Sequence, residues 1–297
     1  MEYRKTAFSL EQHLELLSNK GLVVPDKDRA QRYLQSIGYY RLSAYFSPFL
    51  TDNTFKDGCL FDDILALYIF DRKLRQLAMD ALERIEVAFR TVISNKMSQS
   101  HGPHWFLNGS LFKRGYIDSG DHKKLINQIG YATGKNNHSG RTTACQHYYK
   151  TYTSPPYPPS WVITEVLTMG NWSRIYKELK TKYQKRISTF FAYENTDLET
   201  WIHALTLIRN NCAHHNRLWN HPLPPKAKNI ATYTYSGIPL NRPYTQFTLI
   251  QAFLKTYTHN PTWSKRLSEL LSKCPLDIHE HMKFPENWEE IPFWDIK

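Results

Sequence analysis

The chain has 297 residues, of which 41% are apolar and 14% aromatic, and it carries a formal net charge of +11. This length and composition exclude a largely disordered chain and are sufficient for one large domain or two small ones. The positive charge favours an anionic partner, and its combination with 42 Phe, Trp and Tyr side chains suits RNA better than a membrane surface. We find no secretory apolar segment and no apolar run near the roughly 18 residues of a membrane span, so we expect a cytoplasmic protein.

Cysteine spacing gives no sign of a metal site or a disulfide framework. Cys59, Cys145, Cys212 and Cys274 are far apart and form no C-x2-C pair, whereas zinc sites and small disulfide-stapled folds use closely spaced cysteines. We therefore expect four reduced thiols, no metal ion and no cofactor.

Two helices are predicted in the N-terminal part of the chain. Ser9, followed by Gln at the third position after it, is a capping box that starts the first helix, and Gly21 ends it. The second runs from Asp26 or Asp28 to Ile37. We assign residues 1–58 to a helical N-terminal elaboration.

An aromatic segment, Tyr39–Phe46, follows these helices. We interpret it as a packing wedge against the next long helix rather than as a platform for stacking on bases. Arg41 within it is a candidate contact to an RNA phosphate.

The longest periodic segment covers residues 61–97, where apolar residues recur at helical spacing without Gly or Pro. A helix of this length needs partners along its whole length, so we expect an all-α bundle. Charged residues between the apolar positions, such as Glu86 and Arg90 at i,i+4, are interpreted as a solvated face.

Residues 99–158 contain many glycines and histidines and are predicted to form loops around short helices. Within this stretch, Lys123 and Lys124 are candidates for an RNA-binding surface.

A further helix is predicted from Trp161 to Gly170, with an apolar face that Glu165 interrupts. A carboxylate among core residues is costly unless it is paired, so we expect a partner such as Arg209 or Arg84. Structural pairing is the favoured role of Glu165, and positioning of a catalytic arginine is its functional interpretation.

The most polar helix end in the chain begins at Arg209. A helix capped by Thr196 or Asp197 is predicted to carry apolar residues to Ile208 and then the segment RNNCAHHNRLWN, residues 209–220, with the prolines from Pro222 onward ending it.

The residue types in this segment suit RNA cleavage. A neutral imidazole can take the proton of a ribose 2′-hydroxyl, an imidazolium can protonate the leaving 5′-oxygen, and a guanidinium can hold the phosphate charge without a metal. The segment resembles the R-x4-6-H motif of the HEPN ribonucleases, with Arg209 and Asn210 followed by His214 or His215. Arg141 and His147 also match this spacing, but they lie in a polar stretch without helical periodicity.

The proposed roles follow from this motif. Arg209 holds the scissile phosphate, Asn210 orients it or the histidine, His214 is the general base or acid, and His215 is its substitute; Arg217 is a further RNA contact. Arg209 and His214 lie about 140° apart on an ideal helix, so either the helix loosens near His214 or a second copy of the motif, in a homodimer, completes the site.

Several separate blocks resemble the Abi (AbiD/AbiF) abortive-infection family of bacteria. They are TAFSLEQHLELLSNKGL at 6–22, LYIFDRKLR at 67–75, ALERIEVAFR at 81–90, PSWVITEVLTMG at 159–170 and RNNCAHHNRLWN at 209–220. The family belongs to the HEPN superfamily, so the resemblance implies a HEPN-like helical core at residues 59–222, a role in antiphage defence, RNA as substrate, and a small structured regulatory RNA as a second partner.

Residues 223–297 match none of these blocks and form a C-terminal appendage, with helices predicted at 247–257 and 263–271 and a tail that packs back through Trp288, Phe293 and Trp294. The predicted function is a metal-independent endoribonuclease used as an RNA-cleaving toxin in defence. Two alternatives remain: a non-catalytic RNA-binding protein of a defence or toxin–antitoxin system, and a protein-interaction module in which the polar residues only satisfy the helix C-terminus.

Overall fold

A computed structural model of the chain describes residues 2, 6–135, 142–223, 227, 230, 238–258 and 262–296. These residues form helices and one two-stranded sheet, so the predicted all-α fold is confirmed. In this described part of the chain, no helix combines the length and apolar character needed to cross a membrane.

The helices follow one another along the chain with short connections. The α-helices are α1 (Leu10–Asn19), α2 (Lys27–Ile37), α3 (Tyr39–Ser43), α4 (Phe61–His101), α5 (Arg114–Asp118), α6 (Asp121–Thr133), α7 (Thr143–Thr151), α8 (Ser160–Ile163), α9 (Met169–Glu178), α10 (Thr181–Ser188), α11 (Asn195–Ala213), α12 (Pro243–Tyr257), α13 (Trp263–Leu271) and α14 (Ile278–Met282). The 3-10 helices are η1 (Ser47–Phe49), η2 (Trp105–Leu107), η3 (Gly109–Leu111), η5 (Thr189–Phe191) and η7 (Trp288–Glu290), and strands β1 (Leu50–Thr51) and β2 (Thr54–Phe55) form an antiparallel hairpin.

The N-terminal helices start and end where the sequence predicts. Ser9 caps α1 with the expected capping box, and the turn after α1 places Gly21 at a φ of +87°, a backbone conformation that glycine adopts without strain. Asp26 accepts a hydrogen bond from the Arg29 backbone N–H at 2.8 Å and caps α2. Among the following aromatics, Tyr45 packs in the core, which supports the packing-wedge interpretation, but Tyr40 is 91% exposed.

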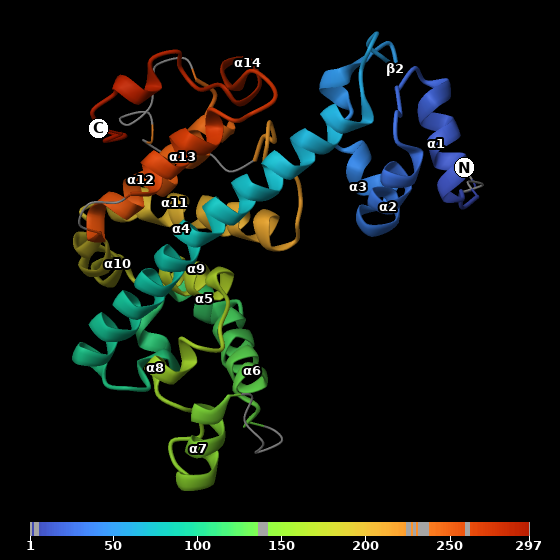
Figure 1. Cartoon of the computed structure of the whole chain (residues 1–297). Coiled ribbons are helices and arrows are strands. Elements are labelled where there is room, and N and C mark those ends of the chain that lie inside the picture. Colours follow the sequence, from blue (N-terminus) through green and yellow to red (C-terminus); the bar gives the residue numbers. More distant parts are fainter. Residues whose placement is uncertain are drawn as a thin grey trace.

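Helix α4 is the spine of the fold (Figure 1). It runs diagonally through the molecule, with α1 to α3 at one end and α6 and α7 toward the other, and α9, α11, α12 and α13 pack against it. The predicted helix over 61–97 is confirmed and continues to His101. Its inward positions, including Leu74, Leu82 and Phe89, are fully buried, because the 3.6-residue repeat keeps one broad stripe facing these partners.

The region after α4 differs from the prediction in two ways. The stretch over 99–158 holds a helix of 13 residues, α6, and not only short helices. The predicted helix ending at Gly170 is wrong: α8 stops at Ile163, and Gly170 lies in the first turn of α9. The reason is a new helix start, because Thr168 and Asn171 form a capping box just before Gly170 would have ended the helix.

The C-terminal part packs on the same core. The predicted helices correspond to α12 and α13, and the indole N–H of Trp263 donates to the Leu77 carbonyl of α4 at 2.9 Å. The tail folds back as expected, with Trp288 and Trp294 buried. One continuous hydrophobic core therefore runs through all three parts of the chain.

Candidate active site at the end of helix α11

Helix α11 places the polar motif at the edge of the core. Its buried residues Trp201, Ile202, Leu205 and Ile208 face α4 and α9. The N-cap is Glu194, so the predicted cap at Thr196 or Asp197 is wrong by two or three residues. Burial of this apolar stripe fixes the helix along its length, and the polar motif occupies its last turn.

Helix α11 ends at Ala213 through a Schellman motif and not through the later prolines. The backbone N–H of His215 donates to the Cys212 carbonyl at 3.1 Å, and that of Asn216 donates to the Asn211 carbonyl at 2.9 Å. His215 has a φ of +59°, the left-handed conformation that this motif requires. The prediction that prolines from 222 onward end the helix is therefore wrong, because a tighter signal stops it nine residues earlier.

His214 is the C-cap residue of α11 and its side chain is exposed. Its backbone N–H still donates to the Asn210 carbonyl at 2.9 Å. The helical spiral is therefore intact as far as His214, and loosening begins only at His215. Of the two explanations offered for the angle between Arg209 and His214, loosening of the helix before His214 is not observed.

Arg209 is held by a carboxylate of the spine helix. Its Nε lies 3.3 Å from Oε2 of Glu86, and its Nη1 lies 3.4 Å from Oδ1 of Asn210. The side chain of Glu86 is 12% exposed and that of Arg209 is 30% exposed. Within the described chain, none of the hydrogen bonds joins Arg209 to His214. The two contacts engage one edge of the guanidinium and leave Nη2 without a protein partner among the described residues.

Two further arginines hold the turn after α11 in place. Nη1 of Arg41 donates to the His215 carbonyl at 2.9 Å, and Arg217 donates to the Ala44 carbonyl. Both predicted RNA contacts thus tie the motif turn to the N-terminal helices by hydrogen bonds to main-chain carbonyls. The sequence separations exceed 170 residues, so this pairing was not visible in any local pattern.

The segment that follows is anchored by Asp71 of α4. Its carboxylate accepts the backbone N–H of Leu218 at 3.1 Å and of Trp219 at 2.6 Å, the Tyr45 hydroxyl at 2.6 Å, and the Arg75 guanidinium. Asp71 is 0% exposed and Arg75 is 4% exposed. Burial raises the pKa of Asp71, and the Arg75 guanidinium and the other donors act to lower it; burial beside Asp71 also raises the pKa of Tyr45.

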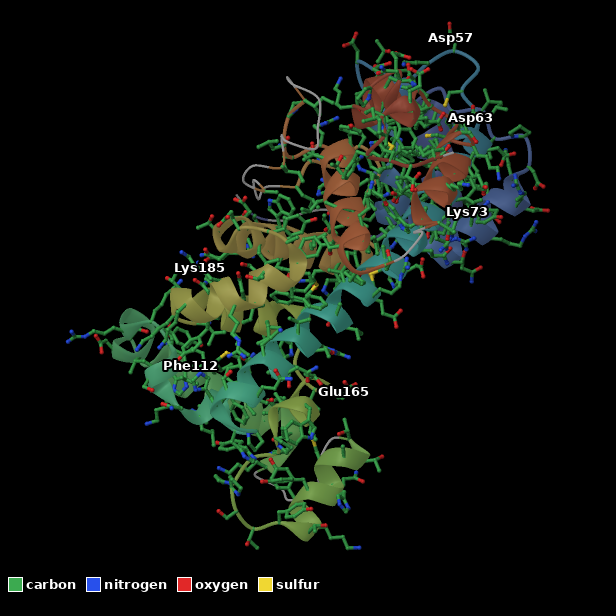
Figure 2. The ribbon with its side chains drawn as sticks, turned by 90° about the vertical axis from the view of Figure 1, so that its left-hand side faces the viewer. Asp57, Asp63, Lys73, Phe112, Glu165 and Lys185 are labelled. Atoms are coloured by element: carbon green, nitrogen blue, oxygen red, sulfur yellow. The ribbon has the colours of Figure 1, made fainter. Side chains whose placement is uncertain are left out.

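The prediction for Glu165 is wrong in its partner. Glu165 lies 3.5 Å from Nη2 of Arg90, and not beside Arg209 or Arg84, and its side chain is 59% exposed. Figure 2 shows Glu165 beside α4, at the margin of the molecule. Trp161 is also exposed, at 53%, because the short α8 turns both side chains away from the core.

Glu86 is the site residue that sequence reasoning missed. The i,i+4 spacing pairs it with Arg90, but in the structure Arg90 contacts Glu165 and Glu86 contacts Arg209. The spacing of charges along one helix carries no information on which other helix lies against it. The only available signal was the intermediate position of Glu86 beside the apolar stripe.

The remaining predicted residues lie away from this cluster. Lys123 and Lys124 are exposed on α6, where Nζ of Lys124 lies 2.8 Å from Asp121. Arg141 of the second motif match lies outside the described residues. The four cysteines are free thiols, and no group of three His, Cys, Asp or Glu side chains in the described chain is arranged to hold a metal ion.

Comparison with known proteins gives one match. A sequence model of a family described as Abi-like protein covers residues 32–220, which include α4, α9 and the whole motif segment. None of the curated proteins and none of the solved structures compared with the chain matches it.

Proposed function

The chain belongs to the Abi-like protein family, and on that premise we propose that it is a metal-independent endoribonuclease acting in abortive infection, a defence against phage. The family suggests the defence role. The cleavage activity is supported by one observation above the others: Arg209 is held by Glu86 at the end of α11, one turn before the exposed His214.

In the proposed reaction the 2′-oxygen of a ribose attacks the adjacent phosphorus, and the bond to the 5′-oxygen breaks. His214 in its neutral form takes the proton of the 2′-hydroxyl, and a protonated group delivers a proton to the leaving 5′-oxygen. The products are a 2′,3′-cyclic phosphate and a 5′-hydroxyl. Histidine suits either step because it titrates near neutral pH.

Arg209 stabilises the charge on the phosphate in this scheme. The Glu86 carboxylate and the Asn210 side-chain oxygen engage Nε and Nη1, so the guanidinium is fixed before a substrate arrives, and Nη2 remains for a phosphate oxygen. A donor that is already oriented costs no reorganisation during the reaction. Glu86 is thus a positioning residue, and Asn210 supports it from the same helix as Arg209.

The scheme needs two proton-transfer groups, and each chain offers His214 with His215 as its substitute. Because the helix is intact up to His214, the separation of about 140° between Arg209 and His214 remains. A homodimer that brings two motifs together across a two-fold axis supplies both the second imidazole and the missing alignment. This dimer is part of the proposal.

The test is cleavage of end-labelled single-stranded RNA in EDTA by wild type, Arg209→Ala and His214→Ala, with folding and mass in solution checked for each. Wild type should leave cyclic phosphate ends, and each variant should lose at least about 100-fold in rate with its stability nearly unchanged. Cleavage that survives in His214→Ala and His215→Ala alike would refute the assigned chemistry, and activity in a strict monomer would refute the dimer.

Absence of cleavage with tight, salt-sensitive RNA binding would select the non-catalytic RNA-binding alternative. In that case the second proposed partner, a small structured RNA, becomes the ligand of interest. The interaction-module alternative predicts instead that Arg209→Ala fails to fold.

A further inference from the structure

A groove runs between α9 and α11, next to the candidate site but outside it. Its volume is about 620 Å³, and its lining includes Ser173, Arg174 and Lys177 of α9 together with Glu199, His203 and Thr206 of α11. Ser173 and Thr206 form the buried floor, at 8% and 6% exposure. His203 and Lys177 are exposed on the two walls. None of these residues has a role in the proposed chemistry.

The groove points along α11 toward His214. Gly170 at the start of α9 lies beside Thr206, since a Cβ at Gly170 would be 3.7 Å from the Thr206 side chain. At the other end, Gln184 donates both to the Lys177 carbonyl and to the Glu199 carboxylate. The two helices are therefore antiparallel, and the groove extends from Glu199 toward the end of α11.

Helical geometry places the motif in line with this groove. His203, Asn210 and His214 are separated by 7 and 4 residues, which brings all three to within about 40° on one face of α11. At 1.5 Å per residue, His203 and His214 are about 16 Å apart along the helix axis. A chain lying in the groove is thus led past Asn210 to the exposed imidazole of His214.

The outer end of the groove is strongly basic. Residues 174–186, which cover the end of α9 and most of α10, contain six Lys or Arg and one Glu. Lys177, Lys180 and Lys185 are exposed, and Figure 2 shows Lys185 at the edge of the molecule. A net charge of +5 over 13 residues is a large share of the +11 of the whole chain, and it lies where a polyanion would enter the groove.

Two carboxylates also line the groove and refine the kind of ligand. Glu199 accepts a hydrogen bond from Gln184 at 3.4 Å, and Glu178 lies beside it in the lining. Carboxylates repel phosphates but accept hydrogen bonds from the exposed edges of unpaired bases and from 2′-hydroxyls. Helices in packing contact are only about 8–10 Å apart, so the groove between them is too narrow for a duplex.

We propose that this groove binds a single-stranded segment of RNA, with phosphates at Arg174, Lys177 and His203, and guides it to His214. This inference rests on the proposed function and adds the path of the substrate. It also moves the main RNA contact from Lys123 and Lys124 to α9 and α10. Arg174 is partly engaged, with Nη2 3.0 Å from Asp121, whereas the Lys177 ammonium has no side-chain partner among the described residues.

The experiment measures binding of a fluorescein-labelled single-stranded RNA by anisotropy, with His214→Ala as the parent so that the RNA stays intact. Arg174→Ala/Lys177→Ala is compared with Lys265→Ala/Lys273→Ala, which removes the same charge from exposed positions on α13 and just after it. Removing one phosphate-binding cation from a single-strand site lowers the salt slope by about 0.7. The groove variant should therefore bind about tenfold more weakly at about 0.2 M salt, with a slope lower by about 1.4, and the control should bind like the parent.

Lys177→Glu is the second variant, because it leaves the Arg174 contacts in place and removes doubt about folding. Equal reductions of affinity in the groove and control pairs would overturn the groove while leaving cleavage by the wild type intact. Weaker self-association in place of weaker RNA binding would also overturn it, since the groove would then be a protein interface. A wild-type protein that neither binds nor cleaves RNA would refute the proposed function itself.

Discussion

The buried pair of Asp71 and Arg75 carries the strongest stability prediction. Replacing Asp71 by Asn leaves the Arg75 charge in the core without its counter-ion, where Asp71 is 0% exposed and Arg75 is 4% exposed. Removing one partner of a buried ion pair costs about 3–5 kcal/mol. A domain of ordinary stability has only about 5–15 kcal/mol in total, so Asp71→Asn should unfold at a much lower urea concentration.

A matched control is available on the surface. Arg114 and Asp118 form the same i,i+4 pair of residue types, with side chains 93% and 62% exposed and a distance of 3.3 Å between Nε and Oδ2. Asp118→Asn should change the free energy of unfolding by no more than about 1 kcal/mol. The double variant Asp71→Asn/Arg75→Gln should recover part of the stability, because no unpaired charge remains.

Equilibrium urea unfolding at neutral pH, followed by circular dichroism, measures all of these variants on one scale. The m-value must stay constant for the comparison to hold. If Asp71→Asn falls within about 1 kcal/mol of the wild type, well short of the cost of an unpaired buried charge, the assignment of Asp71 as the anchor of the motif turn is refuted.

The other predictions concern the motif and its surroundings. Glu86→Gln should lower the cleavage rate by about 10- to 100-fold through misplacement of the motif arginine, whereas Glu83→Gln, exposed on the same helix, should have no effect. His215→Gly should be about 1 kcal/mol more stable than His215→Ala, measured by urea unfolding, because glycine accepts the left-handed turn; the opposite order would refute the Schellman assignment. Burial, with a smaller contribution from the Arg217 charge, lowers the pKa of His221 below 6.5. The unfolded chain therefore binds this proton more readily, and stability falls as the pH drops below about 6.5; His221→Gln should flatten that fall in urea midpoints measured from about pH 7.5 to about pH 5, and an unchanged slope would contradict it.

Much of the fold was predictable because its signals are local. The capping box at Ser9, the cap at Asp26 and the long apolar stripe of α4 act within one or two helical turns, and each appears in the structure at or near its predicted position. Errors arose where two local signals competed. At Gly170 the capping box of a new helix prevailed over the helix-ending tendency of glycine.

The candidate site was located by its sequence but not assembled by it. The order of residue types after Ile208 placed Arg209, Asn210 and His214 at one helix end, since spacing along a single helix fixes relative position. The same spacing rule paired Glu86 with the wrong arginine. An i,i+4 pair on a surface is worth only about 0.2–0.5 kcal/mol, so contacts with another helix readily override it.

By itself, then, the sequence determined the helical elements, the apolar faces and the motif, because all of these depend on residues near one another in the chain. Tertiary structure alone decided that Glu86 meets Arg209, that Asp71 holds the backbone of Leu218 and Trp219, and that Glu165 meets Arg90. Each of these contacts joins residues more than 70 positions apart. They form only after burial of the apolar faces has fixed how the helices cross, and no local pattern contains that geometry.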